Sequence, residues 1–435
     1  MNQNNDSSLN MDTSGSPIKR YCQPSRSSHA DNNTSIVSTN ESTTMLLTNG
    51  SVITWGNDYR NQVPPEIAQL QDIVGISTTD NAFAALRKNR SVVTWGAPYS
   101  GAYIPLEIAK LEDIVSLYAT NNAFVALRAN CNIVAWGQKP WGGQLPPEIA
   151  QLQDIVSLST TQSAFAALRA DRSVVAWGNE DFGGLIPPEV AKLQDIVILK
   201  ATDSAFTALR EDHSVVSWGP AINGGTIPTD IAQLQDITSL TVTSSAFAAL
   251  RADRNVVAWG NSDTGGQIPS EVAKLQDIVS LSATINAFAA LRADRSVVAW
   301  GNKDWGGQIP PDIAKLQDII SLASTNQAFS ALRADYSVVA WGDKNSGGQI
   351  PPDIAQLNDI ASLSTTEGAF AALRADRSVI AWGDSCYGGQ IPPEIAKLRD
   401  IISLNSSRYA FTALRADGRR VGWGGKDTKA HGEYD

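Results

Sequence analysis

Few side chains in this sequence could take part in covalent or acid–base chemistry. The three histidines, His29, His213 and His431, lie far apart at unrelated positions. A catalytic site needs a nucleophile, a base and a group that orients the base, all within hydrogen-bonding reach. No such triad, phosphate-binding glycine loop or metal-spaced Cys/His set is evident in the sequence. We therefore expect a protein without catalytic activity, cofactor or metal.

Three stretches with the pattern Asn-x-Asp-x-Gly faintly resemble the start of a calcium-binding loop. Calcium requires about six to eight oxygen ligands, which is more than these stretches supply. Asn and Asp in such short stretches commonly form Asx turns, and we prefer that interpretation. The stretches are Asn179-x-Asp181-x-Gly183, Asn261-x-Asp263-x-Gly265 and Asn302-x-Asp304-x-Gly306.

An aspartate and an arginine recur together nine times, with the arginine fifteen residues after the aspartate. Asp113 and Arg128 are one such pair. If the two residues lie on neighbouring antiparallel strands joined by a short turn, they face each other at the far end of the ladder. A cross-strand ion pair stabilises a sheet. Because function rarely needs nine identical copies, we interpret the pair as structural and not as a ring of charge for a ligand.

The elements that position these residues belong to an internal repeat. Trp-Gly recurs at one position of the pattern ten times, from Trp55 to Trp423, at a spacing of 40 residues once and 41 residues eight times. An internal period of this length decides the architecture before the chain length does. The tryptophan stands at one fixed position of every copy, as Trp136, Trp177 and Trp300 illustrate, and this constancy indicates a packing residue between copies.

A typical copy runs from Asp277 to Gln317 and contains three short runs with β character, DIVSLSA, AFAALR and SVVAWG. Polar turns separate these runs, which we interpret as strands A, B and C. Between strand C and the next strand A lies GGQIPPDIAKLQ, where Gly-Gly favours a tight turn and the prolines suit the first turn of a short helix. One copy cannot bury both faces of its sheet, so neighbouring copies must stack.

The sequence thus predicts an all-β fold, a β-propeller of ten three-stranded blades of about 41 residues each. One closed ring is the preferred arrangement, and an open superhelical array is the alternative. Residues 1–34 are rich in Ser and Asn and have little apolar periodicity, so we expect a disordered leader there. Residues 35–425 form the repeats, and residues 426–435 are predicted to be a flexible tail.

The run AFAALRADRSVVAWGNKDWGGQIP resembles the regulator of chromosome condensation repeat. That pattern joins a strand ending in Ala-Leu, a turn with Asp-Gly, a strand ending in Trp-Gly, and a following Gly-Gln. In unit length and in the order of Trp-Gly, Gly-Gln and Pro, the chain is also similar to the beta-lactamase inhibitory proteins of type II, which have short three-stranded blades. The resemblance spans nearly the whole chain from about residue 35. It implies a propeller that binds proteins with one face.

The sequence also departs from that pattern. The Gly-His that usually precedes strand B is replaced by pairs such as Asn121-Asn122. The nucleotide-exchange members of the family act through an inserted wedge, whereas the copies here have nearly the same length. Ten copies also exceed the usual number of propeller blades. These departures count against guanine-nucleotide exchange on a small GTPase, which stays an alternative.

Two stretches vary between the copies, the turn between A and B and the loop after Trp-Gly. Because successive strands alternate in direction, both stretches fall at the same end of each blade, and we expect them to form one binding face. Aromatic residues in exposed loops are common anchors of protein interfaces. The alternative is that these rings only cover blade edges. The candidate binding residues are Trp141, Phe182, Trp305 and Tyr387, followed by Tyr59, Asn122, Asn326 and Tyr409.

The net charge of -10 and the isoelectric point near 4.9 argue against a nucleic-acid partner. No run approaches the length of a membrane span, and the N-terminus lacks the apolar core of a secretory signal. We therefore expect no membrane insertion, and a protein that is cytoplasmic or released without a cleavable signal peptide. The leader's composition resembles the secretion signal of bacterial effectors delivered by contact-dependent injection.

The preferred functional interpretation is a monomeric protein-interaction propeller that binds a macromolecular partner through its variable loops. A bacterial effector or an inhibitor would fit this description. Besides nucleotide exchange, a carbohydrate-binding lectin is an alternative, since aromatic residues repeated around a ring can stack on sugars.

Overall fold

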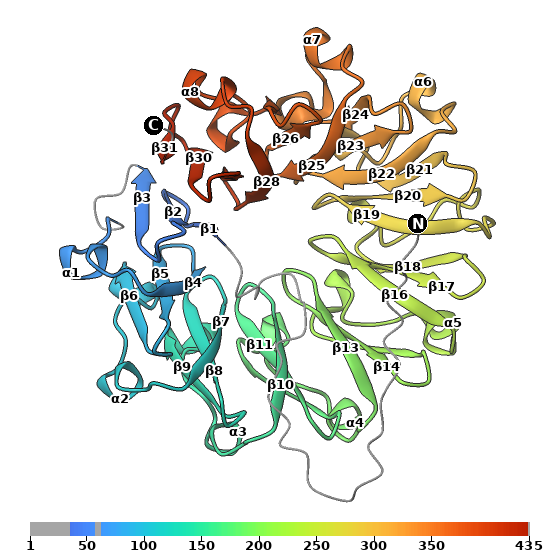
Figure 1. Cartoon of the computed structure of the whole chain (residues 1–435). Helices are drawn as coiled ribbons and strands as arrows, with labels where there is room; N and C mark the ends of the chain where they lie inside the picture. The colour runs from blue at the N-terminus through green and yellow to red at the C-terminus, as the bar shows by residue number, and fades with distance from the viewer. Residues whose placement is uncertain (1–34, 57–61, 434–435) are drawn as a thin grey trace, which may run out of the picture.

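Ten small antiparallel sheets follow one another around a closed ring (Figure 1). This computed structural model describes residues 35–56 and 62–433. The predicted all-β propeller of ten blades is confirmed. In these ranges no helix is both long enough and apolar enough to cross a lipid bilayer.

Each blade has the strand order A, B, C. The first five blades are β1 (Ile36–Ser38), β2 (Ser42–Leu46), β3 (Val52–Gly56); β4 (Ile73–Thr78), β5 (Ala82–Arg87), β6 (Val92–Gly96); β7 (Ile114–Ala119), β8 (Ala123–Arg128), β9 (Ile133–Gly137); β10 (Ile155–Thr160), β11 (Ala164–Arg169), β12 (Val174–Gly178); and β13 (Ile196–Ala201), β14 (Phe206–Arg210), β15 (Val215–Trp218). The last five are β16 (Ile237–Val242), β17 (Ala246–Arg251), β18 (Val256–Gly260); β19 (Ile278–Ala283), β20 (Ala287–Arg292), β21 (Val297–Gly301); β22 (Ile319–Ser324), β23 (Ala328–Arg333), β24 (Val338–Gly342); β25 (Ile360–Thr365), β26 (Ala369–Arg374), β27 (Val379–Gly383); and β28 (Ile401–Ser406), β29 (Ala410–Arg415), β30 (Arg420–Gly424).

The segment that joins strand C to the next strand A, called a connection below, contains a tight helical turn and in most blades a short α-helix. Proline at the first helical position fixes φ and needs no hydrogen-bond partner for its nitrogen, which explains how four residues can form a helix. The helices are α1 (Pro65–Ala68), α2 (Leu106–Ala109), α3 (Pro147–Ala150), α4 (Pro188–Ala191), α5 (Thr229–Ala232), α6 (Pro311–Ala314), α7 (Pro352–Ala355) and α8 (Pro393–Ala396). The preceding turns are η2 (Pro98–Ser100), η3 (Lys139–Trp141), η4 (Glu180–Phe182), η5 (Ala221–Asn223), η6 (Ser262–Thr264), η7 (Lys303–Trp305), η8 (Lys344–Gly348) and η9 (Ser385–Tyr387).

The repeated tryptophan joins neighbouring blades, as predicted. In the seventh blade Trp300 lies opposite Phe288 in the ladder, and the two rings stack with centroids 5.3 Å apart. The Trp300 indole also donates a 3.0 Å hydrogen bond to the carbonyl of Gly265 in the preceding connection. Gly265 has φ of +97°, and a Cβ there would lie 2.6 Å from the Phe288 ring, so only glycine fits.

The predicted Asp–Arg pairing is present in all nine blades that carry it. Ile114, the first residue of β7, faces Arg128 in the ladder, so Asp113 lies just beyond the end of the paired region. Arg128 contacts Asp113 at 2.9 Å, and the nine equivalent pairs lie between 2.6 and 3.0 Å. The pair therefore belongs to the scaffold.

The first and last blades meet and close the ring. Strand β1 lies against β28 and β29. The hydroxyls of Ser38 and Ser407 are 2.7 Å apart, and the Trp55 indole donates to the carbonyl of Gly424 at 2.8 Å. The closed ring, and not the open superhelical array, is the arrangement observed.

The end of the chain differs from the sequence-based expectation of a flexible tail. His431–Gly432 form strand β31, which pairs with the outer strand β30 and gives the last blade a fourth strand. His431 stacks on Trp55 with ring centroids 4.4 Å apart. The tail is held because it packs where the last blade meets the first, a contact that depends on ring closure and leaves no local signal in the sequence.

The variable face and the central channel

A repeated threonine ties the two variable stretches of a blade together in seven blades. In the third blade Thr120 stands just before the A–B turn, and its hydroxyl donates to the carbonyl of Trp141 in η3 at 2.8 Å. The backbone N–H of Gln138 donates to the carbonyl of Asn122 at 3.0 Å. The predicted convergence of A–B turns and loops after Trp-Gly on one face therefore has a physical cause, because both stretches are bonded to each other.

The A–B turns also bond to one another around the centre of the ring. The first variable residue of each turn donates its backbone N–H to the carbonyl of the equivalent residue in the next blade, through nine bonds of 2.8–3.0 Å. At the remaining junction the Asn40 carbonyl accepts a hydrogen bond from the Lys426 ammonium at 2.8 Å. We call the ten residues of this chain the channel ring: Asn40, Asp80, Asn121, Gln162, Asp203, Ser244, Ile285, Asn326, Glu367 and Arg408.

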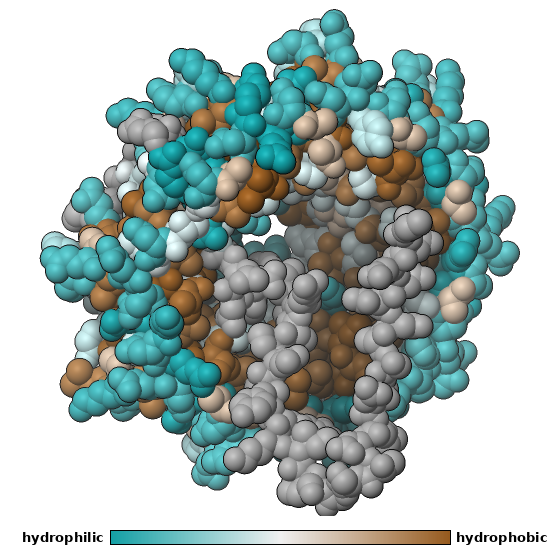
Figure 2. All heavy atoms as spheres, in the orientation of Figure 1, coloured by the Kyte–Doolittle hydropathy of each residue, from teal (hydrophilic) through white to brown (hydrophobic). Residues whose placement is uncertain are grey.

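The channel ring borders a cavity of about 820 Å³ at the centre of the propeller. Figure 2 shows the ring from one face, with an opening near its centre and apolar atoms on the inner wall. Side chains from the inner strands line the cavity together with most of the channel ring, and Thr78, Thr120 and Thr160 contribute hydroxyl groups. A concave site with mixed polar and apolar lining is the usual form of a ligand or partner site.

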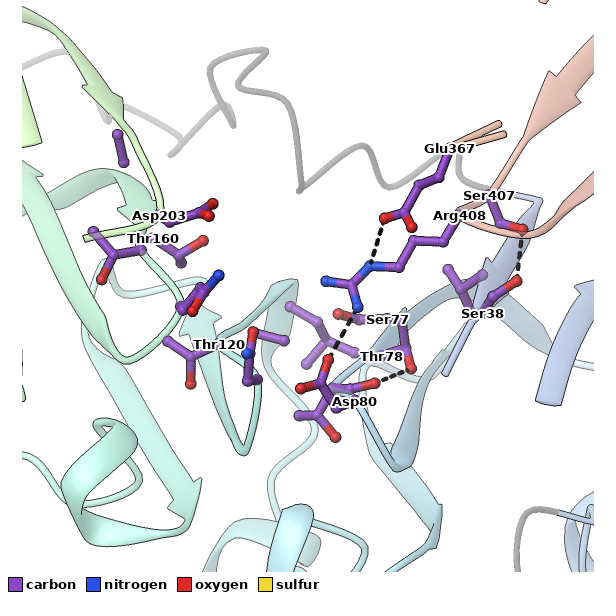
Figure 3. Close-up of a pocket in the computed structure, with 18 of the residues that line it drawn as sticks. Ser38, Ser77, Thr78, Asp80, Thr120, Thr160, Asp203, Glu367, Ser407 and Arg408 are labelled. Carbon is purple, nitrogen blue, oxygen red and sulfur yellow. Dashed lines mark hydrogen bonds and ion pairs between the residues drawn. The ribbon is translucent and has the colours of Figure 1, made fainter. Parts of the chain in front are cut away.

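Arg408 is the cation of the channel ring and extends over the cavity (Figure 3). Its guanidinium group contacts Asp80 at 3.0 Å and Glu367 at 3.7 Å, and therefore links the second, ninth and tenth blades. Asp203 extends into the same cavity from the fifth blade, away from this ion-pair cluster (Figure 3). The ring thus carries three carboxylates and one guanidinium group, an excess of negative charge.

Burial in the channel changes the acidity of two of these carboxylates. Desolvation raises the pKa of Asp203, and the positive charge of Arg408 opposes part of this effect. Desolvation also raises the pKa of Glu367, against the effects of Arg408 and of a hydrogen bond from Asn326. Both carboxylates are therefore more costly to ionise in the folded ring than in water.

The structure places the first-choice aromatic residues on the variable face but only half-exposed. Trp141 packs beside the apolar cluster between the third and fourth blades, Phe182 beside the next cluster, and Tyr387 beside the cluster of the last two blades. Trp305 is half-buried as well. Trp141, Phe182 and Tyr387 therefore cover part of a blade edge, and each keeps part of its surface exposed.

The secondary candidate Tyr409 lies beside the first-choice residue Tyr387. Tyr387 and Tyr409 have ring centroids 5.1 Å apart, and the Lys426 ammonium lies 5.8 Å from the centroid of Tyr409. Burial, followed by the negative charge of Glu367, raises the pKa of Tyr409 to about 12. This pair forms an aromatic and cationic patch beside the junction of the first and last blades.

The two predicted amide residues contact their own scaffold. The Asn122 side chain accepts a hydrogen bond from the Ser100 hydroxyl at 2.9 Å. Asn326 belongs to the channel ring and bonds to Glu367. Tyr59 lies outside the described residues. Binding by any of these eight residues stays a prediction.

Sequence reasoning missed two kinds of residue. Thr120 and its equivalents recur before the A–B turn in nine consecutive blades, so comparison of the copies could have found them. Tyr99, in η2, is 82% exposed and is the most exposed large apolar residue described, yet it is not among the candidate binding residues predicted from the sequence. Within the described ranges, no group of three or more His, Cys, Asp and Glu side chains could hold a metal ion.

The fold and the central channel define the class of protein, a β-propeller. No family model matches the sequence, and no curated protein matches it. Solved structures similar to the chain include the ectodomain of the receptor kinase CR4 from Physcomitrella patens, at 19% identity over 65% of this chain and 77% of that chain, with a TM-score of 0.37. The CRINKLY WD40 ectodomain of the Arabidopsis thaliana receptor kinase ACR4 is 18% identical over 60% of this chain and 90% of that one, with a TM-score of 0.34. Prp20p from Saccharomyces cerevisiae is 18% identical over 65% of this chain and 74% of that chain, with a TM-score of 0.36.

Proposed function

We propose that the protein is a non-catalytic binding propeller whose macromolecular partner, a protein, docks on the face formed by the A–B turns and the η turns. One observation supports this proposal above the others. The side chains that are constant between blades make contacts inside the scaffold, as the Trp300–Gly265 and Asp113–Arg128 contacts show. The side chains that differ between blades gather at one end of the ring, around the channel.

The proposal fits the physics of a repeat scaffold. Repetition stabilises a ring through contacts between neighbouring blades, which leaves the loop side chains free to vary without loss of the fold. Binding residues are found mainly on loops that a rigid scaffold positions. Half-buried aromatic side chains such as Trp141 suit this role, because a side chain that is already ordered loses little conformational entropy on binding.

Affinity capture with matched variants tests the proposal. In the double variant Trp141→Ser and Trp305→Ser, each tryptophan is replaced by the residue that the equivalent loops carry as Ser100 and Ser346. We expect the variant to keep the melting temperature of the native protein within a few degrees and to lose the partners that the native protein retains. Tyr336→Arg, at a B–C turn on the opposite end of the blades, is the control and should retain them.

Equal capture by the double variant and the native protein would contradict a partner site at these loops. If the double variant melts much earlier because Trp141 supports the neighbouring cluster, Trp305→Ser with Tyr409→Ser keeps the face testable without touching that cluster.

We also propose a mode of action and a site of action for the protein. A binding propeller without catalytic chemistry acts by occupying its partner, as an inhibitor or an effector does. The Ser- and Asn-rich composition of residues 1–34 supports delivery out of a bacterial cell, and the alternative is action in the cytoplasm. Fusing residues 1–34 to a cytosolic reporter enzyme distinguishes the two, because delivery predicts reporter activity in contacted cells and cytoplasmic action predicts none.

A further inference from the structure

The connections differ in how much apolar surface they expose. Five of the large apolar side chains described are more than 60% exposed: Tyr99 82%, Leu106 71%, Tyr103 70%, Ile222 66% and Leu185 64%. All five lie in the connections that follow the second, fourth and fifth blades. No large apolar residue described in the connections after the sixth to ninth blades reaches comparable exposure. The most exposed apolar side chains therefore lie on one part of the ring, between the second and the sixth blades.

Three of these residues lie in one connection, where they replace the small or polar residues of the repeat. Positions equivalent to Tyr99 carry Asp181, Asp263 and Asp304 in other blades. Gln is the most frequent residue at the position of Tyr103, and Pro at the position of Leu106. The fold does not require the apolar residues, because other blades form the same turn and helix without them. A scaffold role therefore does not explain them.

The affected connections contain α2, α4 and α5, and one further connection, with α3, lies between the first two of them. Helices α2, α3 and α4 follow one another along the outer edge of the ring (Figure 1). The intervening connection carries the half-buried Trp141 in η3, and the next carries Phe182 in η4. We call the surface formed by Tyr99, Tyr103, Leu106, Leu185 and Ile222 the rim arc.

The charge around the rim arc indicates the chemistry of its occupant. When the aspartates that pair with the scaffold arginines are left out, the four connections after the second to fifth blades carry seven carboxylates and three lysines. The four connections that follow carry eight carboxylates and six lysines or arginines. In the channel ring, Asp203 lies in the fifth blade, and Asp80 lies in the second blade, where it is paired with Arg408. Apolar anchors surrounded by negative charge are complementary to an apolar surface with a basic rim.

We infer that the rim arc is the primary docking surface for the partner, and that the partner presents apolar side chains flanked by lysine or arginine. This inference rests on the proposed function. It places the main contact at the second to fifth blades and extends the docking surface from the η turns to the residues that follow them in the connections. The partner's apolar residues contact Tyr99, Tyr103 and Leu106, while its basic residues face the surrounding carboxylates. A few residues supply most of the binding energy of an interface, and tyrosine is among the residue types most often found in that role.

A defined peptide probe tests the inference. A phage-displayed library of random peptides is selected on the full-length protein, and the enriched peptides are synthesised and titrated by fluorescence anisotropy. The key variant is Y99D/Y103Q/L106P, which restores the residues that the repeat carries elsewhere and should melt within a few degrees of the native protein. We expect enriched peptides to combine apolar residues with Lys or Arg, to bind the variant at least about ten-fold more weakly, and to bind the native protein more weakly at high salt.

The matched controls separate this inference from the proposed function. Tyr336→Arg removes a 57% exposed apolar residue far from the rim arc and should bind the peptides with native affinity. If W141S/W305S loses binding while Y99D/Y103Q/L106P binds normally, the rim arc is excluded and the proposed face stands. If both variants bind the peptides normally, neither the proposed binding face nor the rim arc is the docking surface. Enriched peptides without basic residues, or no enrichment at all, would overturn the inferred chemistry of the partner.

Discussion

The indole nitrogen of Trp55 and the carbonyl oxygen of Gly424 are 2.8 Å apart, although 369 residues separate them in the chain. A tryptophan indole also donates to a glycine carbonyl between internal blades, as Trp300 does to Gly265 at 3.0 Å. The first and last blades therefore meet by the same type of bond as internal neighbours, although Gly424 ends strand β30 and Gly265 follows turn η6. His431 adds a stacked ring on Trp55, which makes the C-terminal segment part of this junction.

Trp55→Phe should lower the local stability of both the first blade and the last blade. The substitution leaves the Gly424 carbonyl buried without its donor, which costs about 1–3 kcal/mol of unfolding free energy. Hydrogen–deuterium exchange should increase in β1–β3 and also in β28–β30. The matched variant Trp259→Phe removes the equivalent bond to Gly224 and should increase exchange only in the fifth and sixth blades. Faster exchange confined to β1–β3 in Trp55→Phe would mean that the ring does not close in solution.

Gly265→Ala should destabilise the protein far more than Gly418→Ala. Both glycines have positive φ, +97° and +87°, so alanine at either position bears a backbone cost of about 1 kcal/mol. Only at Gly265 would the new methyl group also meet the Phe288 ring, at 2.6 Å, whereas nothing lies within 4 Å at Gly418. The difference between the two variants in chemical denaturation measures the packing between blades. Equal losses would show that the neighbouring blades yield to the added methyl group.

The blade could be predicted from sequence because its fixed residues act locally. Trp300 and Phe288 face each other in one ladder, and Asp113 and Arg128 pair across one hairpin, so the repeat alone places them. Ring closure could not be derived in this way. The contact between Trp55 and Gly424 depends on the small rotation between successive blades, summed over all ten, and no single copy encodes that sum.

The candidate site was less predictable for a related reason. The alternation of strands placed the variable loops on one face correctly, but exposure within a loop depends on how each η turn lies against the next blade. Trp141 turns towards the apolar cluster, whereas Tyr99, two positions before a glycine in the preceding connection, turns to solvent. Arg408 bonds to Asp80 across the junction of the ring, a contact without any signature in sequence spacing.

Arg295→Gly should stabilise the protein by up to about 1 kcal/mol. Arg295 occupies the left-handed region at φ of +63°, where the first and last blades carry Gly50 and Gly418. Glycine removes the steric cost of that conformation. Arg172→Gly is the matched control, because Arg172 forms an ion pair with Glu211 of the next blade, whereas the position equivalent to Glu211 beyond Arg295 is Ala334. In urea denaturation, the free energy of unfolding should rise less in the control than in Arg295→Gly. A lower free energy of unfolding in Arg295→Gly would show that the Arg295 side chain makes a stabilising contact.

Asp203→Asn should raise the melting temperature at neutral pH and leave it unchanged in strong acid. Burial raises the pKa of Asp203 above its unfolded value of about 3.9. The stability associated with the neutral carboxyl group is therefore fully present below the unfolded pKa and is lost as the pH rises through the folded pKa. Asparagine cannot ionise, and Asn121 already occupies the equivalent position of the channel ring in the third blade.

The reciprocal variant Asn121→Asp provides the control with the opposite sign. It adds a carboxylate to the channel ring with little change in shape, so it should lower the melting temperature at neutral pH and have no effect where the new carboxyl group is protonated in both states. Differential scanning calorimetry across the acid range measures both variants. A lower melting temperature for Asp203→Asn at neutral pH would show that attraction to Arg408 outweighs the desolvation of Asp203, and the channel would then favour its negative charge.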